Sequence, residues 1–98
     1  MASKLIILPS ARQDLHEASG WYHQINPDLS DEFIEAVNAA FIVIEKHAQL
    51  QQKIYNNFRK VNLKKFPYKI IYQVGKEEIT IIAVAHHKRH PGYWKRRK

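Results

Sequence analysis

The chain has 98 residues, a formal net charge of +7 and 45% hydrophobic residues. This length predicts one domain over residues 1–98 with a single modest core. The sequence contains no cysteine, which excludes disulfides and thiolate zinc sites and fits a cytoplasmic location. Its apolar runs are shorter than the ~20 residues of a membrane span, and residues 5–8 are too few for a signal peptide. We therefore expect no membrane partner.

The charge is divided unevenly between the two halves of the chain. Residues 1–50 hold 3 Lys or Arg against 7 Asp or Glu, a balance of −4, whereas residues 51–98 hold 13 against 2, a balance of +11. A domain with one basic face is a common footprint of nucleic-acid binding, although basic proteins also bind polyanions nonspecifically. We therefore expect an anionic partner, which is RNA, DNA or an acidic protein segment.

The chain begins with a predicted strand and a predicted helix. Residues 4–8 are a short apolar strand ended by Pro9. Ser10 and Gln13 have the Ser-x-x-Gln spacing of a capping box, which predicts that a helix begins at Ala11. Its apolar side chains recur at helical spacing and are expected to face the core. They are Ala11, Leu15, Ala18, Trp21, Tyr22 and Ile25.

A second, longer helix is predicted over residues 27–48. Asn26 and Pro27 end the first helix and begin this one, because proline suits the first helical turn. The apolar face of the second helix consists of Leu29, Phe33, Ala36, Val37, Ala40, Phe41, Ile44 and Ala48. The short connection predicts that the two helices form an antiparallel hairpin.

The second half of the chain predicts strands. Residues 58–63 alternate, residues 68–74 and 79–85 are rich in β-branched and aromatic side chains, and residues 75–77 form a turn. The predicted order is β-α-α-β-β-β. This order indicates an α+β fold in which a helical hairpin packs on one face of a mostly antiparallel sheet.

The opposite face of this sheet is expected to be uncovered and polar. Alternation places Lys60, Asn62 and Lys69 on that face, and Arg59 on the helix side, where it is expected to pair with a helix carboxylate such as Glu35. Together with the basic end of the chain, these side chains are expected to form one electropositive surface that binds the anionic partner.

Residues 86–98 combine Lys, Arg and His with Tyr93 and Trp94 directly after the last predicted strand. Such a cluster of like charges repels itself, which indicates that an anionic group normally lies against it. A frayed basic tail is the simpler alternative, but adjacent large aromatic side chains usually pack. We expect His86 and Arg89 to pin this segment to backbone carbonyls. We expect no metal site, because adjacent histidines on a strand point to opposite faces.

Three stretches of the sequence resemble the RelE/ParE superfamily of bacterial type II toxins. They are SARQDLHEASGWYHQINPDLSDEF, FRKVNLKKFPYKIIYQV and ITIIAVAHHKRHPGYWKRR, which together span nearly the whole chain. The resemblance implies a growth-arresting toxin encoded beside a cognate antitoxin that wraps a flexible, often acidic segment around it. RelE-like members cleave mRNA on the ribosome, whereas ParE-like members poison DNA gyrase and have no known catalytic chemistry.

The resemblance also implies candidate catalytic residues. Metal-independent RNA cleavage by the 2′-OH needs a base, an acid and cations beside the phosphate, and no cofactor. The positions of the RelE-like catalytic side chains fall on Lys60, Asn62, Lys69, His87 and Tyr93. Lys60 and Tyr93 keep their residue type, but Lys69 and His87 replace arginines, and a lysine cannot hold a phosphate in the bidentate way of arginine.

The remaining basic residues of this half are candidates for binding the target. They are Lys64, Lys65, Lys88, Arg89, Lys95 and Arg96. The favoured hypothesis is a ParE-like poison of DNA gyrase, and the alternative is a RelE-like endoribonuclease that acts on mRNA at the ribosome. A non-toxic nucleic-acid-binding module and a degenerate toxin that only binds an antitoxin are further alternatives.

Overall fold

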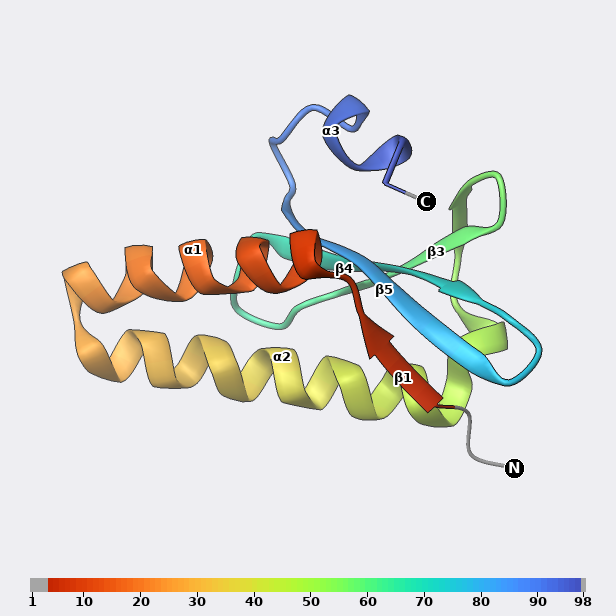
Figure 1. Cartoon of the computed structure of the whole chain (residues 1–98). Helices are drawn as coiled ribbons and strands as arrows, with labels where there is room; N and C mark the ends of the chain where they lie inside the picture. The colour runs from red at the N-terminus through yellow and green to blue at the C-terminus, as the bar shows by residue number, and fades with distance from the viewer. Residues whose placement is uncertain (1–3, 98) are drawn as a thin grey trace.

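The computed structural model describes residues 4–97 and confirms the predicted α+β fold (Figure 1). The helices are α1 (Pro9–Ile25), α2 (Pro27–His47), the short 3-10 helix η1 (Ala48–Leu50) and α3 (Gly92–Lys95). The strands are β1 (Lys4–Ile7), β2 (Lys53–Tyr55), β3 (Phe58–Asn62), β4 (Tyr68–Val74) and β5 (Glu78–His86). Within the described chain these strands form one five-stranded sheet of order β1-β5-β4-β3-β2.

The sheet is mostly antiparallel, as predicted, and β1 is the exception. β1 pairs with β5 in parallel, and β4 pairs with both β3 and β5 in antiparallel register. The short elements β2, η1 and α3, which are three or four residues long, were not predicted from the sequence. Among residues 4–97, no helix is long and apolar enough to cross a membrane.

The predicted capping box at the start of α1 is wrong. The helix begins at Pro9, two residues before Ala11, and Leu8 is its extended N-cap residue. Proline fits the first helical position because the backbone there needs no N–H donor. Asn26 does cap α2 as its position suggests, because its Oδ1 accepts a hydrogen bond of 2.9 Å from the backbone N–H of Asp28.

The helical hairpin covers one face of the sheet and forms the main core. Tyr22 of α1 and Phe33 of α2 pack against Phe66 and Tyr68, with ring centroids 5.0 to 6.2 Å apart. The Tyr72 hydroxyl crosses this core and donates a 2.7 Å hydrogen bond to the backbone carbonyl of Ala48. Burial raises the pKa of Tyr72 to about 12. The predicted apolar face of α2 is confirmed, with Phe33 among its buried residues.

Trp21 departs from its predicted place in the core. Its side chain is 60% exposed, as is that of Ile25, so the end of α1 carries two large apolar groups in solvent. Arg59 also departs from its predicted ion pair. Its guanidinium donates a 2.7 Å hydrogen bond to the backbone carbonyl of Gln51, which ties β3 to the segment before β2.

The opposite face of the sheet is not the open polar surface that the sequence predicted. A second apolar cluster covers its centre, and its buried members are Phe58, Ile71, Ile82, Ala83, Ala85 and Trp94. Trp94 belongs to α3, which folds back over this face after the chain leaves β5 (Figure 1). The physical reason lies in β5, because its run of apolar residues supplies side chains to both faces of the sheet.

An irregularity in β5 helps to form this second cluster. Ile71 lies opposite Ala83, but the next residue, Tyr72, lies opposite Ile81, so Ile82 is an extra residue in β5. Such a bulge reorients one side chain relative to simple alternation. As a result, Ile82 joins Ala83 in the second cluster instead of the core beneath the helices.

Candidate functional site

Two of the four candidate catalytic side chains, Lys60 and Lys69, lie on the same face of neighbouring strands, and a third, His87, follows the end of β5. Lys69 in β4 lies opposite Asn62 in β3 on one side and opposite Ala85 in β5 on the other. Lys60 is two residues before Asn62, so it is a diagonal neighbour of Lys69, and His87 in the turn after β5 is close enough for the charges of both lysines to act on it. Diagonal side chains on one sheet face are roughly 7–8 Å apart. We call Lys60, Lys69 and His87 the cation row.

The cation row is held in place by local hydrogen bonds. The Lys60 ammonium donates to Asn62 Oδ1 at 3.2 Å, and the His87 backbone N–H donates to the Pro67 carbonyl at 2.8 Å. Burial lowers the pKa of His87, and the positive charges of Lys69, Lys60 and His86 lower it further. The lowered pKa favours the neutral form of the His87 imidazole. A bound anion would offset these charges and favour its protonated form.

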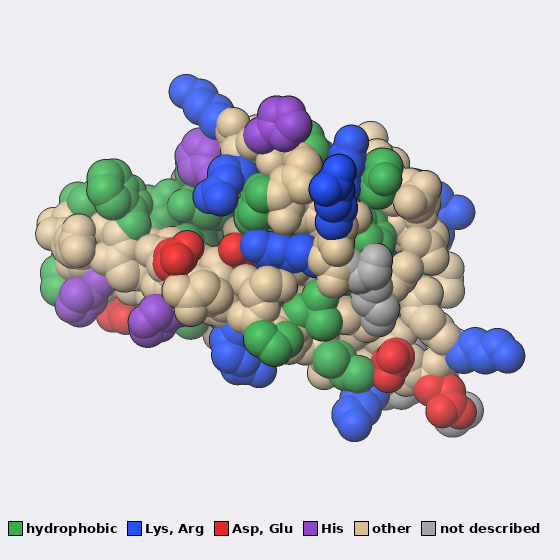
Figure 2. All heavy atoms as spheres, turned by 45° about the horizontal axis from the view of Figure 1, so that its top comes forward, with side chains coloured by type: hydrophobic (Ala, Val, Ile, Leu, Met, Phe, Trp, Pro, Cys, Tyr) green, Lys and Arg blue, Asp and Glu red, His purple; other side chains and the backbone are tan. Residues whose placement is uncertain are grey.

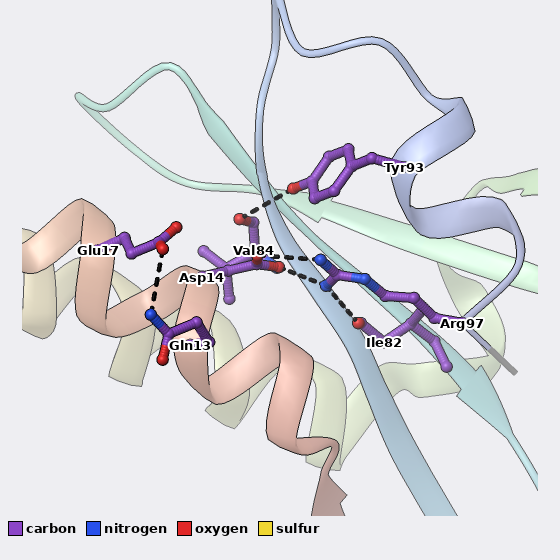
Figure 3. Close-up of polar contacts among 7 residues, drawn as sticks. All are labelled: Gln13, Asp14, Glu17, Ile82, Val84, Tyr93 and Arg97. Atoms are coloured by element: carbon purple, nitrogen blue, oxygen red, sulfur yellow. Dashed lines mark hydrogen bonds and ion pairs between the residues drawn. The ribbon is translucent and has the colours of Figure 1, made fainter.

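Tyr93, the fourth candidate, is held in a different environment. Its hydroxyl is directed at the backbone carbonyl of Val84, at 3.5 Å (Figure 3). The Arg89 and Arg97 guanidinium carbons lie 4.1 and 4.7 Å from the centre of its ring. Burial and the charge of Asp14 raise the pKa of Tyr93 to about 12, although both arginines act in the opposite direction. The groups that act on this phenol thus include Asp14, Arg97, Arg89 and the hydroxyl of Tyr68.

The network around Tyr93 includes two residues that were not predicted as site residues. Asp14 Oδ2 accepts from the backbone N–H of Val84 at 3.1 Å and from Arg97 Nη1 at 2.6 Å. Arg97 Nη1 also donates to the carbonyl of Ile82 at 3.1 Å (Figure 3). The sequence contained one sign of this network. Asp14 adjoins the apolar positions of α1, so its carboxylate was placed to lie near the core.

The six candidate target-binding residues come from three separate segments of the chain. Lys64 and Lys65 lie in the connection between β3 and β4, Lys88 and Arg89 follow β5, and Lys95 and Arg96 lie in or after α3. Lys95 places its ammonium 4.6 Å from the centre of the Tyr55 ring. Figure 2 shows Lys and Arg side chains separated by apolar, acidic and histidine side chains on the face in view. The expectation of one continuous basic sheet surface is therefore wrong.

His86 forms a local turn rather than the predicted bond to a carbonyl. Its Nδ1 accepts from the backbone N–H of Lys88 at 3.0 Å, and its ring packs edge-on against Tyr68 at 5.1 Å. The backbone N–H of Arg89 then donates to the His86 carbonyl at 3.0 Å. In the described part of the chain, no group of three or more His, Cys, Asp or Glu side chains is arranged to hold a metal ion.

A comparison with known protein families identifies the family of this chain. The profile described as "ParE toxin of type II toxin-antitoxin system, parDE" matches residues 5–91. The chain belongs to the ParE toxin family. It is therefore a ParE-like toxin of a type II toxin–antitoxin system, and the resemblance stated from the sequence is confirmed.

Solved structures agree with the fold of this ParE-family toxin. A structure described as "Chromosomal ParDE TA system from P. aeruginosa" superimposes with a TM-score of 0.76 and 17% sequence identity. The match covers 87% of this chain and 96% of that chain. At this identity the likeness supports the shared fold. A search of curated proteins found no match.

Proposed function

We propose that this ParE-family toxin arrests growth by poisoning DNA gyrase and that it performs no bond-breaking chemistry of its own. The engagement of the Tyr93 hydroxyl with the Val84 carbonyl is the observation that supports this proposal. An RNA-cleaving site needs an acid and a base on opposite sides of one phosphate, within hydrogen-bond reach of the reacting oxygens. Lys60 and Lys69 share a sheet face and act on His87, but the Tyr93 hydroxyl is directed at the Val84 carbonyl.

The electrostatics of Tyr93 also argue against a catalytic role. A general acid or base acts best when its pKa lies near the working pH. A half-buried phenol with a pKa of about 12, packed against Arg89 and Arg97, neither gives up nor accepts a proton readily near pH 7. The structural role of this ring is to hold two arginines and the end of the chain beside β5.

The cation row has a simpler role in this proposal. Lys60 and Lys69 supply two positive charges on one sheet face, and an anion beside His87 would favour its charged form. Such a row fits the phosphate backbone of DNA, which gyrase holds while its strands are cut. Contacts of this kind position a protein on DNA without reading base sequence.

The partner that controls this toxin is proposed to be a cognate antitoxin, encoded beside it and acting in the cytoplasm. The family description places such toxins in two-component systems. A toxin with a net charge of +7 is suited to an antitoxin that carries an acidic segment.

Purified protein distinguishes the two targets. The toxin is incubated with gyrase and supercoiled plasmid, and the linear DNA released by denaturing the enzyme is measured. In parallel it is added to translating ribosomes and mRNA cleavage is mapped. The proposal predicts trapped gyrase–DNA complexes and intact mRNA. Cleaved mRNA together with unaffected gyrase would exclude it.

A RelE-like endoribonuclease is the second candidate, and it is favoured by the shared sheet face of Lys60 and Lys69 and by the action of both charges on His87. In that case the acid and base are a histidine and a lysine, without tyrosine. A non-toxic nucleic-acid-binding module or a degenerate toxin is a further alternative. Expression of the chain without an antitoxin tests both, because either would accumulate without arresting growth.

A further inference from the structure

A pocket of about 140 Å³ lies between α1 and the segment that follows β5. Its buried lining residues are Ala18 of α1 and Val84 of β5. Trp21 also lines this pocket and is 60% exposed, so a large aromatic ring is open to solvent at its side. A cavity of about 150 Å³ holds one benzene ring, so a pocket of this size suits a flat ring system and not a peptide helix.

The two sides of this pocket carry opposite charges. α1 supplies Glu17 on one side, and the segment after β5 supplies Arg89 on the other. Figure 3 shows Glu17 and Tyr93, the ring that Arg89 contacts, on either side of Val84. Glu17 and Arg89 are both exposed, so a ligand reaches their charged groups without displacing packed side chains.

These two charged groups have unused hydrogen-bonding capacity. The Glu17 carboxylate accepts one hydrogen bond, from Gln13 at 3.1 Å, and a carboxylate has room for several. Within residues 4–97 the Arg89 guanidinium donates no hydrogen bond, and its N–H groups form a fork that suits two acceptors side by side. Asp14, the other carboxylate of this pocket, is already paired with Arg97.

We propose that this pocket binds the base of an unpaired guanine nucleotide. The base stacks on the Trp21 indole, its N1–H and N2–H groups donate to the Glu17 carboxylate, and its O6 and N7 atoms accept from the Arg89 guanidinium. Stacking on an aromatic side chain and a bidentate arginine contact to O6 and N7 are recurrent in nucleic-acid recognition. The inference goes beyond the proposed function, because it holds whether or not gyrase is the target.

The opposite charges favour guanine over the other bases. Adenine has an acceptor at N1 and a donor at N6, so it would set an acceptor against Glu17 and a donor against Arg89. The pyrimidines lack N7 and therefore lose the bidentate contact with arginine. A guanine within a duplex is also excluded, because its N1–H and N2–H groups already donate to the opposite cytosine. Each lost bidentate contact typically weakens binding by about five- to 150-fold.

The surroundings of this pocket are suited to the phosphate groups of the nucleotide. His86 lines the pocket, and the next residue, His87, belongs to the cation row, so the two sites adjoin at the end of β5. The backbone N–H of Lys88 donates to His86 Nδ1 at 3.0 Å, which holds this exposed lysine in the turn beside the pocket. A strand whose base enters the pocket would therefore have cations beside its neighbouring phosphates.

Binding of short oligonucleotides to the purified toxin tests the proposal. The probes are fluorescein-labelled, single-stranded oligothymidines in which the central base is guanine, adenine or thymine. All three carry the same number of phosphates, so nonspecific attraction to the basic protein contributes equally to their affinities. We expect fluorescence anisotropy to show that the guanine probe binds at least about fivefold more tightly than the other two.

Matched variants assign this preference to the pocket. Trp21→Ala is expected to weaken binding of the guanine probe by about tenfold, because the stacking surface is lost. Ile25→Ala removes an equally exposed side chain at the end of the same helix and should leave the affinity unchanged. Glu17→Gln should reduce the preference for guanine to less than about twofold, whereas Glu32→Gln makes the same change of charge on α2 and should preserve it. Thermal unfolding confirms that each variant is folded.

Competition experiments distinguish the two sources of this base. Displacement of the guanine probe by GMP, but not by AMP, would support the pocket and identify a free nucleotide as its ligand. Displacement by the unlabelled guanine oligonucleotide, but not by GMP or by unlabelled oligothymidine, would support the pocket and identify a nucleic-acid strand.

Two results would overturn this inference. They are equal affinities for the three probes, and a guanine preference that persists in both Trp21→Ala and Glu17→Gln. If the toxin still traps gyrase–DNA complexes in either case, the proposed function stands without the guanine pocket.

Discussion

Asp14 in α1 and Arg97 near the end of the chain form a two-point ion pair, with contacts of 2.6 Å and 3.1 Å. Their side chains are 11% and 16% exposed, so the pair is largely shielded from solvent. The same carboxylate accepts the backbone N–H of Val84 in β5. One side chain therefore joins the first helix, the interior strand β5 and the last residues of the described chain.

Removal of this carboxylate is expected to destabilise the fold and release the end of the chain. Asp14→Asn keeps the shape of the side chain but leaves the Arg97 guanidinium without its counter-charge, at a cost of about 2–4 kcal/mol. Chemical denaturation measures the change, and proteolysis after residue 89 reports release of the segment. Glu17→Gln is the control, because Glu17 is exposed and bonds only Gln13 among the described residues, and it should shift stability by less than about 0.5 kcal/mol.

Trp94 anchors the cover of the second sheet face by packing and not by hydrogen bonding. It is 3% exposed, and its indole N–H is buried with no hydrogen-bond partner among residues 4–97. Trp94→Ala is expected to cost about 3–5 kcal/mol, whereas Trp94→Phe removes the unpaired N–H and should cost much less. Equilibrium unfolding measures the free energy of unfolding of both variants. An equal decrease for Trp94→Ala and Trp94→Phe would contradict this account of Trp94.

The stability of the protein should fall in alkaline solution because of its buried tyrosines. Tyr72 has its pKa raised to about 12 from an ordinary value of 10, so the folded state favours the neutral phenol. Its stabilising contribution is complete below pH 10 and is lost as the pH rises from 10 through 12, on the order of 2–3 kcal/mol in total. Tyr72→Phe lowers stability at pH 7 by removing the bond to Ala48, but it should flatten the decline between pH 10 and 12. If the stability of Tyr72→Phe declined between pH 10 and 12 as steeply as that of the unmodified protein, other groups would be the cause of the alkaline loss of stability.

The cation row should contribute separately measurable contacts to DNA. The slope of log affinity against log salt is negative. Lys60→Ala or Lys69→Ala is expected to reduce its magnitude by about 0.9 for each phosphate that the variant no longer neutralises. Fluorescence anisotropy of labelled duplex DNA over a salt series measures this slope. Lys76→Ala makes the same change of charge in the β4–β5 turn and serves as the control. If all three variants change the slope equally, the toxin binds DNA through its general charge and not through this row.

The fold could be predicted from the sequence because its main signals are local. The apolar face of α2, the strand from Tyr68 to Val74 and the hairpin connection at Asn26 and Pro27 each follow from periodicity or turn chemistry. The start of α1 could not be placed, because Ser10 offers a capping box that competes with the suitability of Pro9 for the first turn.

The site was less predictable because it depends on interactions between distant segments. Alternation correctly placed Lys60 and Lys69 on one face of the sheet. It could not show that Trp94 returns to cover the centre of that face, or that Arg97 reaches Asp14 across 83 positions of sequence. The bulge at Ile82 also changes the parity of β5, and nothing in a uniformly apolar run marks such an insertion.

The central claim is that this ParE-family toxin acts on gyrase without using the Tyr93 hydroxyl, and one variant tests it most directly. Tyr93→Phe removes the hydroxyl but keeps the ring that Arg89 and Arg97 contact. Two quantities are measured in cells that express this variant or the unmodified toxin. They are the number of trapped gyrase–DNA complexes and the extent of growth arrest. We predict equal growth arrest and equal numbers of trapped complexes. The claim would be contradicted if the folded variant no longer arrested growth and if the unmodified toxin, but not the variant, cleaved mRNA.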